Sequence, residues 1–310
     1  MQYILAPLRG VTVRTFRAVF APALRAEGFT SCVSPFIPAL STKINQSSLR
    51  DVSPADEPLP CVPQAIGKDP AALRALLEAF KRLGHSKADL NAGCPYPMIT
   101  RKGRGAGLLR SPDVLARMLE AGVETMGPGN FSLKVRLGVE SPDELAALMP
   151  MINRFPLANI TVHARTARQM YTGTPDLERF AAIAEASANP VVYNGDFDPA
   201  DPGSPVVSAI MKLQPGSAGT PVAAMVGRPF VKNLALREDA AELLSAYLEA
   251  TEMELCGRSS VLGRMKELLA YWREASPVWR RRWEKIKLCR TTSELRMVLC
   301  CRQQQATSRP

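Results

Sequence analysis

The chain has 310 residues, of which 46% are hydrophobic and 22% charged, a composition typical of a soluble globular protein with a buried core. No stretch approaches the roughly 18 to 20 apolar residues that cross a bilayer, and the N-terminal residues show no signal peptide, so we expect a cytoplasmic protein. The formal net charge of +10 suggests a polyanionic partner.

Short β-rich runs alternate with amphipathic stretches along most of the chain. Strands are predicted at Tyr3–Ala6, Thr30–Ser34, Cys61–Ile66, Ala88–Asn91, Phe131–Val135, Asn159–His163, Pro190–Tyr193 and Val222–Val226. The last five are near-continuous apolar runs, as expected of strands buried on both faces of a parallel sheet. Helical spacing at Ala71–Leu83 and Ser-Pro pairs at 111–112 and 141–142 predict helices between the strands. The pattern predicts an α/β fold, a (β/α)₈ TIM barrel, over residues 1–235.

From about Lys232 the strand signals stop. Helices are predicted at Ala235–Ala250, Val261–Arg273, Val278–Leu288 and Ser293–Cys300. Residues 251–310 carry 13 Lys and Arg against 6 Asp and Glu. We therefore expect a small, basic, all-helical C-terminal domain over residues 236–310.

Polar residues stand where the predicted barrel strands end, which is where barrel enzymes place their reactive groups. They are Gln64, Asn91, Cys94, Lys134, Arg136, His163, Arg165, Asn194, Asp196 and Arg228. Any one of them is more often an ordinary solvated or hydrogen-bonded residue. Their agreement over many strand ends favours a site at this end of the barrel.

The last two loops of the barrel suggest a phosphate. Asn194-Gly195-Asp196 and Gly227-Arg228 supply glycines that allow close approach of the backbone, and Arg228 can pair with a phosphate through two hydrogen bonds. Flavin mononucleotide (FMN) carries such a phosphate, and Lys134 would stabilise its anionic reduced ring. Other phosphorylated ligands would also suit these loops.

The seven cysteines, at positions 32, 61, 94, 256, 289, 300 and 301, include no Cys-x-x-Cys spacing, and the chain has two histidines. This argues against a zinc site, so no metal is expected. Most of these thiols are expected to be small core residues in a reducing compartment.

Seven segments resemble, in order, motifs of the tRNA-dihydrouridine synthases: Leu5–Leu8, Asp89–Pro95, Gly105–Leu109, Leu133–Gly138, Val162–Thr166, Asn194–Asp196 and Met225–Arg228. The second reads Asp-Leu-Asn-Ala-Gly-Cys-Pro, and the resemblance covers roughly residues 1–235. It implies an FMN-dependent barrel that reduces the C5–C6 double bond of particular uridines in tRNA, with NADPH as electron donor. It also implies that hydride passes from flavin N5 to C6 and that Cys94 protonates C5. An unactivated thiol is mostly protonated near pH 7 and can act as that acid.

The resemblance assigns residues to the cofactor and the substrate. The implied flavin contacts are Ala6, Pro7, Leu8, Gln64, Lys134, His163, Asn194, Gly195, Asp196, Gly227 and Arg228. Asn91 and Arg165 are implied to touch the uracil. In the helical domain, Arg281 and Arg282 are candidates for contacts to tRNA phosphates, which would make binding salt-dependent.

Three other functions are consistent with parts of the sequence. A flavin barrel could reduce a free pyrimidine or another small activated alkene, although the basic tail argues against it. A non-catalytic RNA-binding protein would not need the thiol and cofactor loops. A hydrolase using Cys94 and His163 would require a thiol–imidazole contact. The sequence leaves open which uridine is reduced and the oligomeric state, for which a monomer is favoured.

Overall fold

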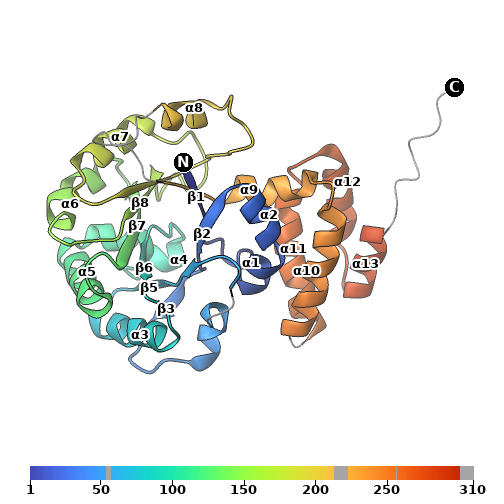
Figure 1. Cartoon of the computed structure of the whole chain (residues 1–310), viewed down its shortest axis with the longest axis horizontal. Coiled ribbons are helices and arrows are strands. Elements are labelled where there is room, and N and C mark those ends of the chain that lie inside the picture. The colour runs from blue at the N-terminus through green and yellow to red at the C-terminus, as the bar shows by residue number, and fades with distance from the viewer. Residues whose placement is uncertain (54–56, 213–222, 256, 301–310) are drawn as a thin grey trace. The chain divides into compact units, whose positions relative to one another are not determined.

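The computed structural model describes residues 1–53, 57–212, 223–255 and 257–300 (Figure 1). These residues fall into two compact units. The first contains Met1–Arg14 and Ala21–Gly227, and the second contains Thr15–Phe20 and the chain from Arg228 onward. Within the described residues, no helix is both long and apolar enough to cross a membrane.

The first unit is built around a parallel sheet whose strands follow the predicted runs. They are β1 (Gln2–Leu5), β2 (Phe29–Val33), β3 (Ile37–Ala39), β4 (Cys61–Val62), β5 (Gln64–Gly67), β6 (Ala88–Ala92), β7 (Phe131–Gly138), β8 (Ile160–Thr166), β9 (Val191–Asn194) and β10 (Ala223–Val226). Their order is β3-β5-β6-β7-β8-β9-β10-β1-β2-β4. Because β2 pairs with β4 and β3 pairs with β5, the two ends of this order meet and the sheet closes. The predicted barrel is confirmed, with its second and third strands each broken into two pieces.

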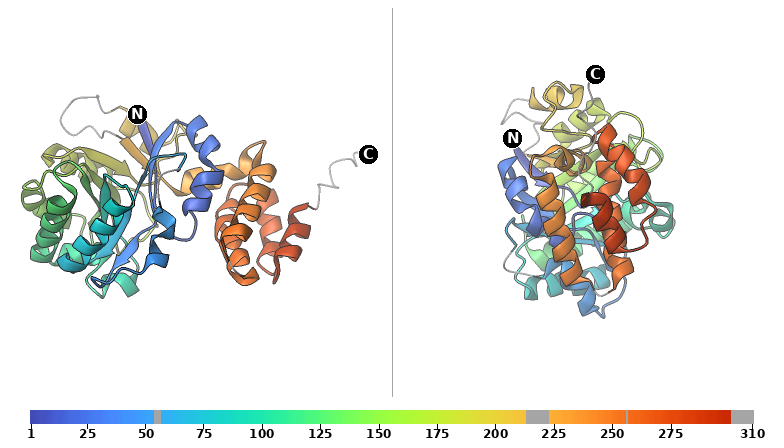
Figure 2. Two further views of the ribbon diagram at one scale, coloured as in Figure 1. Left: turned by 60° about the horizontal axis from the view of Figure 1, so that its bottom comes forward. Right: turned by 90° about the vertical axis from the view of Figure 1, so that its right-hand side faces the viewer.

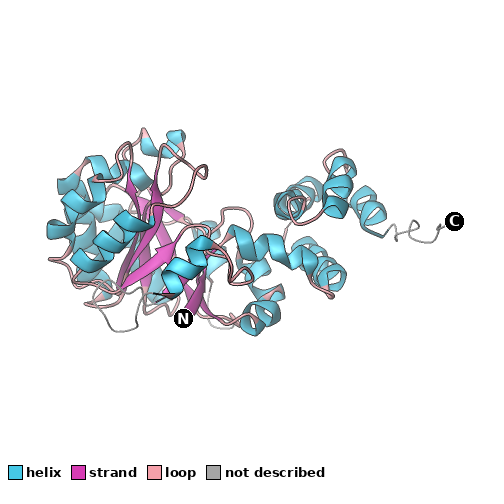
Figure 3. Ribbon diagram, turned by 90° about the horizontal axis from the view of Figure 1, so that it is seen from above, coloured by secondary structure: helices cyan, strands magenta, loops and turns pink. Residues whose placement is uncertain are grey.

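Helices cover the outside of this sheet, as the cyan ribbons around the magenta strands show (Figure 3). They are α2 (Ala21–Ala26), α3 (Pro70–Arg82), α4 (Pro97–Thr100), α5 (Pro112–Met126), α6 (Glu144–Ile152), α7 (Leu177–Ala186) and α8 (Pro205–Met211). Two 3₁₀ helices, η1 (Gln46–Val52) and η2 (Gly105–Arg110), lie in the connections. The helix predicted at the second Ser-Pro pair begins at Glu144 instead of Pro142, because the Glu144 carboxylate accepts the backbone N–H groups of Val139, Glu140 and Ser141.

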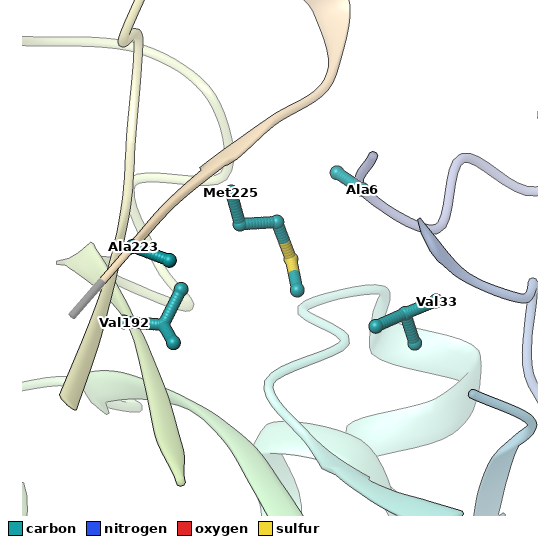
Figure 4. Packing of buried hydrophobic residues seen from close by; sticks show 5 residues of the cluster. All are labelled: Ala6, Val33, Val192, Ala223 and Met225. Atoms are coloured by element: carbon teal, nitrogen blue, oxygen red, sulfur yellow. The ribbon is translucent and has the colours of Figure 1, made fainter. Parts of the chain in front are cut away.

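The barrel interior is apolar on one side and polar on the other. Ala6, Val33, Val192, Ala223 and Met225 form a buried cluster from β2, β9, β10 and the end of β1 (Figure 4). On β6, β7 and β8 the inward positions carry polar side chains instead. Since successive residues of a strand point to opposite faces, an inward Asp89 or Ser132 places Asn91 or Lys134 on the same interior surface, nearer the carboxyl end.

The second unit is helical. It contains α1 (Arg14–Val19), α9 (Arg228–Asn233), η3 (Leu234–Leu236), α10 (Ala240–Glu254), α11 (Arg258–Trp272), α12 (Pro277–Ile286) and α13 (Thr292–Cys300), with Arg14 itself in the first unit (Figure 2). The predicted C-terminal helices are present. However, α9 and η3, which the predicted boundary at residue 235 assigns to the barrel, fall in the helical unit. So does Thr15–Phe20 from the N-terminal part of the chain.

Candidate active site

The predicted strand-end residues of β5, β6, β7, β8 and β9 meet at one end of the barrel. Register pairs place Asn91 of β6 beside Lys134 of β7, and His163 of β8 beside Asn194 of β9. The Gln64 side chain of β5 is fully buried and accepts a hydrogen bond from Asn91 Nδ2 at 2.7 Å. Carboxyl ends of parallel strands share one edge, so five strands contribute to one polar surface.

Asn91 holds the backbone of the segment that carries Cys94. Its Oδ1 accepts the N–H of Gly93 at 3.1 Å and the N–H of Cys94 at 2.8 Å. On the other side, the Cys94 carbonyl accepts the N–H of Ala106 at 3.0 Å. A Cβ on Gly105, which has a φ of +55°, would lie 2.7 Å from the Cys94 carbonyl oxygen, so this close approach requires glycine. The thiol therefore sits on a segment anchored at both ends.

The environment of Cys94 keeps its thiol protonated. Cys94 is 8% exposed, and burial raises the pKa of its thiol above the ordinary value of 9.0. A hydrogen bond from the Tyr96 backbone and the positive charges of Arg136, Arg9 and Lys134 oppose this rise without overcoming it. A thiol with a raised pKa is a poor nucleophile at neutral pH and a competent proton donor.

Lys134 reaches across the barrel interior to Asn194. Its Nζ donates to Asn194 Oδ1 at 2.9 Å, and Asn194 Nδ2 in turn donates to the carbonyl of Met225 at 2.8 Å. Burial and the charge of Arg136 lower the pKa of Lys134 to about 8, although the charges of Asp89 and Cys94 act in the opposite direction. The ammonium therefore remains mostly protonated at pH 7 and supplies a fixed positive charge.

The predicted residues after β1 border the same interior. The Ala6 N–H donates to the Val226 carbonyl at 2.8 Å, and the Leu8 N–H donates to Thr12 Oγ1 at 2.7 Å. Ala6 is buried, whereas Pro7 and Leu8 are half-buried. A Cβ on Gly227 would lie 3.0 Å from Ala6 Cβ and 3.4 Å from Leu8 Cδ2. This glycine keeps open a narrow gap between the two chain segments.

Arg165 lies beneath the loop that follows β8. Its fully buried guanidinium donates to the carbonyls of Thr172 and Gly173, pairs with Asp196 and contacts His163 Nε2 at 3.3 Å. These contacts order the loop, and the predicted contact of Arg165 with uracil stays a prediction. Asp196 uses a carboxylate oxygen for this ion pair.

His163 and Gly195 lie close together on adjacent strands. His163 is 6% exposed, and a Cβ on Gly195 would lie 3.3 Å from His163 Cδ2. The Gly195 carbonyl accepts the hydroxyl of Tyr193 at 2.7 Å. The arrangement leaves no room for a side chain at position 195.

Three predicted residues belong to the helical unit. Arg228 is the first residue of α9, and Arg281 and Arg282 lie on α12. Arg281 is exposed, whereas the Arg282 guanidinium lies 4.9 Å from the centre of the Trp279 ring. Arg282 thus has a packing role within its unit, and the contacts of all three with ligands stay predictions.

Sequence reasoning missed two buried groups. Arg136, noted at a strand end but given no role, donates to the carbonyls of Gly93, Thr166 and Met170 and stacks 5.3 Å from the centre of the Tyr171 ring. Asp89 is 2% exposed, and burial raises its pKa from 3.8 to about 6. An acidic residue inside a buried strand was the available signal for Asp89.

A group of possible metal ligands, also unforeseen, lies elsewhere in the first unit. Ligand atoms of Cys32, Glu57 and Cys61 all lie within 4.8 Å of one another. Cys32 and Cys61 are register partners on β2 and β4, which their separation in the sequence conceals. Two thiolates and a carboxylate could provide three of the four ligands of a tetrahedral ion.

A family model described as dihydrouridine synthase (Dus) matches residues 4–298. The chain is 32% identical over 198 residues to a Pseudomonas aeruginosa protein named tRNA-dihydrouridine synthase B, a match covering 63% of this chain and 58% of that protein. It is 29% identical over 271 residues to a Xanthomonas campestris pv. campestris protein of the same name, covering 87% of this chain and 78% of that protein. The matched part spans 58%, 66% and 61% of the first three curated relatives.

Solved structures show the same fold at low sequence identity. The old yellow enzyme from Trypanosoma cruzi superposes with a TM-score of 0.52 at 11% identity, covering 78% of this chain and 88% of that chain. Identity at this level supports the TIM-barrel-like architecture alone.

Proposed function

The chain belongs to the dihydrouridine synthase family, and on that premise we propose that it reduces the C5–C6 double bond of specific uridines in tRNA, using FMN and electrons from NADPH. The observation that carries the proposal is the buried, anchored Cys94 thiol at the end of β6, beside a polar surface built from five strands. The reaction adds one hydride and one proton to the base. The site offers a proton donor next to a place suited to a hydride carrier.

The residues present fit a flavin. Flavin mononucleotide, when bound, supplies the hydride that adds to C6 of the uracil. Gln64, Lys134 and Asn194 present amide and ammonium groups to the interior, which suit the polar edge of an isoalloxazine ring. The gap kept open by Gly227 and the apolar cluster around Met225 suit its hydrocarbon part.

Cys94 acts as the general acid in this proposal. Its thiol gives its proton to C5, and the resulting thiolate is re-protonated from solvent before the next turnover. The raised pKa makes the thiol fully protonated at neutral pH, which an acid requires and a nucleophile does not. The same feature argues against a cysteine hydrolase.

Lys134 supplies positive charge where electron density builds up. With a pKa of about 8, the ammonium favours an anionic ring beside it at neutral pH. Asn91 and Arg165 are proposed to orient the uracil, Asn91 through its own amide and through its hold on the Cys94 backbone.

The helical unit is proposed to bind the tRNA backbone. Its α12 carries Arg280, Arg281 and Arg282 in succession, and Arg281 is exposed. Guanidinium groups pair with phosphates bidentately, and each contact adds to the salt dependence of binding. This basic surface favours tRNA over a free pyrimidine or another small alkene as the substrate.

The test uses the full-length purified protein. It is expected to be yellow, with flavin absorbance near about 450 nm, to be bleached by NADPH faster than by NADH, and to form dihydrouridine in tRNA from a strain that lacks this protein. Cys94→Ala should keep its flavin and lose about 10²- to 10⁴-fold in rate, the usual contribution of general acid catalysis.

Three results would contradict the proposal. Colourless protein that FMN does not reconstitute would remove the cofactor. Reduction of free uridine as fast as uridine in tRNA would favour the small-molecule reductase. Turnover by Cys94→Ala at the wild-type rate would remove the thiol from the mechanism.

A further inference from the structure

Asp89 lies at the centre of a buried group of polar side chains on the interior of the barrel. It is the register partner of both Gln64 on β5 and Ser132 on β7. Ser132 Oγ donates to Asp89 Oδ1 at 2.6 Å, and Gln64 Nε2 donates to Asp89 Oδ2 at 2.7 Å. Asp89 is 2% exposed. It is a fully enclosed acid to which the proposed mechanism gives no step.

A chain of hydrogen bonds runs from Asp89 to the reactive thiol's backbone. Gln64 donates through Nε2 to Asp89 and accepts through Oε1 from Asn91 Nδ2 at 2.7 Å. Asn91 then accepts, through Oδ1, the backbone N–H groups of Gly93 and Cys94. Three side chains on β5 and β6 thus connect the acid to the segment that carries Cys94.

The carboxylate fixes the direction of this chain. An ionised carboxylate only accepts hydrogen bonds, so the Gln64 amide must turn its NH₂ toward Asp89 and its oxygen toward Asn91. Asn91 must then turn its own NH₂ toward Gln64 and its oxygen toward the N–H groups of the Cys94 segment. An amide that could flip freely would sometimes present NH₂ to those N–H groups and lose both bonds.

We propose that Asp89 is a positioning residue for the uridine reduction, whose carboxylate orients Gln64 and Asn91 so that the Cys94 thiol is held where it can protonate the base. This inference rests on the proposed function, and it adds a residue that acts only through others. The proton transfer itself is unchanged: the S–H bond of Cys94 breaks, a C5–H bond forms, and Asp89 gains or loses nothing.

The test separates the two half-reactions of the full-length protein loaded with FMN. NADPH reduction does not use Cys94, whereas oxidation of the reduced protein by tRNA does. Asp89→Leu, which has a similar size and cannot accept a hydrogen bond, should slow oxidation by tRNA by about 10- to 10²-fold, the range expected of a catalytic group displaced by about 1 Å. Reduction by NADPH and flavin content should be unchanged.

Asp89→Asn should fall between the wild type and Asp89→Leu. Its oxygen can still accept from Gln64, but its NH₂ no longer excludes the opposite arrangement. Thr161→Val is the matched control, because Thr161 is a buried, inward polar residue of β8 outside the hydrogen-bond chain. It should leave both half-reactions unchanged.

A second measurement reads the thiol directly, without any turnover. The rate at which iodoacetamide alkylates Cys94, followed by peptide mass spectrometry, should rise in Asp89→Leu, because the segment is less firmly held. Equal loss of both half-reactions together with flavin loss, or an unchanged oxidation rate, would overturn the inference. Wild-type protein that is reduced yet never forms dihydrouridine would instead overturn the proposed function, and the alkylation rates would still decide the role of Asp89.

Discussion

Replacing Asp89 by asparagine is expected to stabilise the folded protein at neutral pH. Burial raises the pKa of this carboxyl from 3.8 to about 6, because desolvation outweighs the hydrogen bonds from Ser132 and Gln64 and the positive charge of Lys134. At about 1.36 kcal/mol for each pH unit, the ionised carboxylate costs the folded state about 3 kcal/mol. Asparagine has nearly the same size and carries no charge, so the variant should recover on the order of 1 to 3 kcal/mol.

The pH dependence gives the sharper measurement. Between pH 3.8 and about 6 the folded chain binds more protons at Asp89 than the unfolded chain does. The contribution of Asp89 to stability is therefore greatest below pH 3.8 and is lost as the pH rises through 6. The advantage of Asp89→Asn over the wild type should grow by roughly 1 kcal/mol between pH 5 and pH 7, where Lys134 with its pKa of about 8 stays charged.

Urea unfolding at both pH values tests this, with the same saturating FMN concentration for both proteins, because a bound ligand adds to apparent stability. Asp89→Asn that is no more stable than the wild type at pH 7, with a difference independent of pH, would refute the argument that the barrel carries an unfavourable buried charge. If the variant is both more stable and slower in oxidation by tRNA, the acid serves the reaction at the expense of stability.

Three further changes probe other parts of the protein. In stopped-flow measurements, flavin reduction by NADPH should slow as the pH rises through about 8 and Lys134 loses its proton, and Lys134→Met should be slow throughout without that pH step. Gly227→Val should weaken FMN binding by about tenfold or more in a fluorescence titration, since overpacking costs about 1 to 3 kcal/mol, whereas Gly263→Ala, whose Cβ meets nothing within 4 Å, should not. Arg281→Ala with Arg282→Ala should weaken tRNA binding and reduce the slope of log K against log salt by about 1 for each phosphate that is no longer neutralised, and an unchanged slope would place the RNA surface elsewhere.

The barrel was predictable because each strand is a short apolar run with turn residues on either side. Strand ends could also be read, and with them the polar residues that a parallel sheet brings to one edge, such as Lys134 and Asn194. Alternation within a strand even places Asp89 and Asn91 on the same face. What each side chain bonds to depends on register: Asp89 meets Gln64 and Ser132 only because of how β5 and β7 align with β6.

Other features depend on contacts that no local pattern contains. Arg165 ends a strand as predicted, yet its guanidinium turns to the Gly173 carbonyl in the next loop. Cys32 and Cys61 meet through strand pairing, although the spacing of the cysteines gave no sign of it. In both cases the partner is set by the fold of a connecting segment.

The segment Thr15–Phe20 follows the first barrel strand in the chain but belongs to the helical unit. There Phe16 and Phe20 pack against Tyr247, with ring centres 6.0 and 5.6 Å apart. A ribosome therefore releases one piece of the helical unit near the start of synthesis and the rest only at the end. A chain cut after Gly227 would leave Phe16 and Phe20 without that partner, so the two units are to be expressed and engineered as one inseparable product.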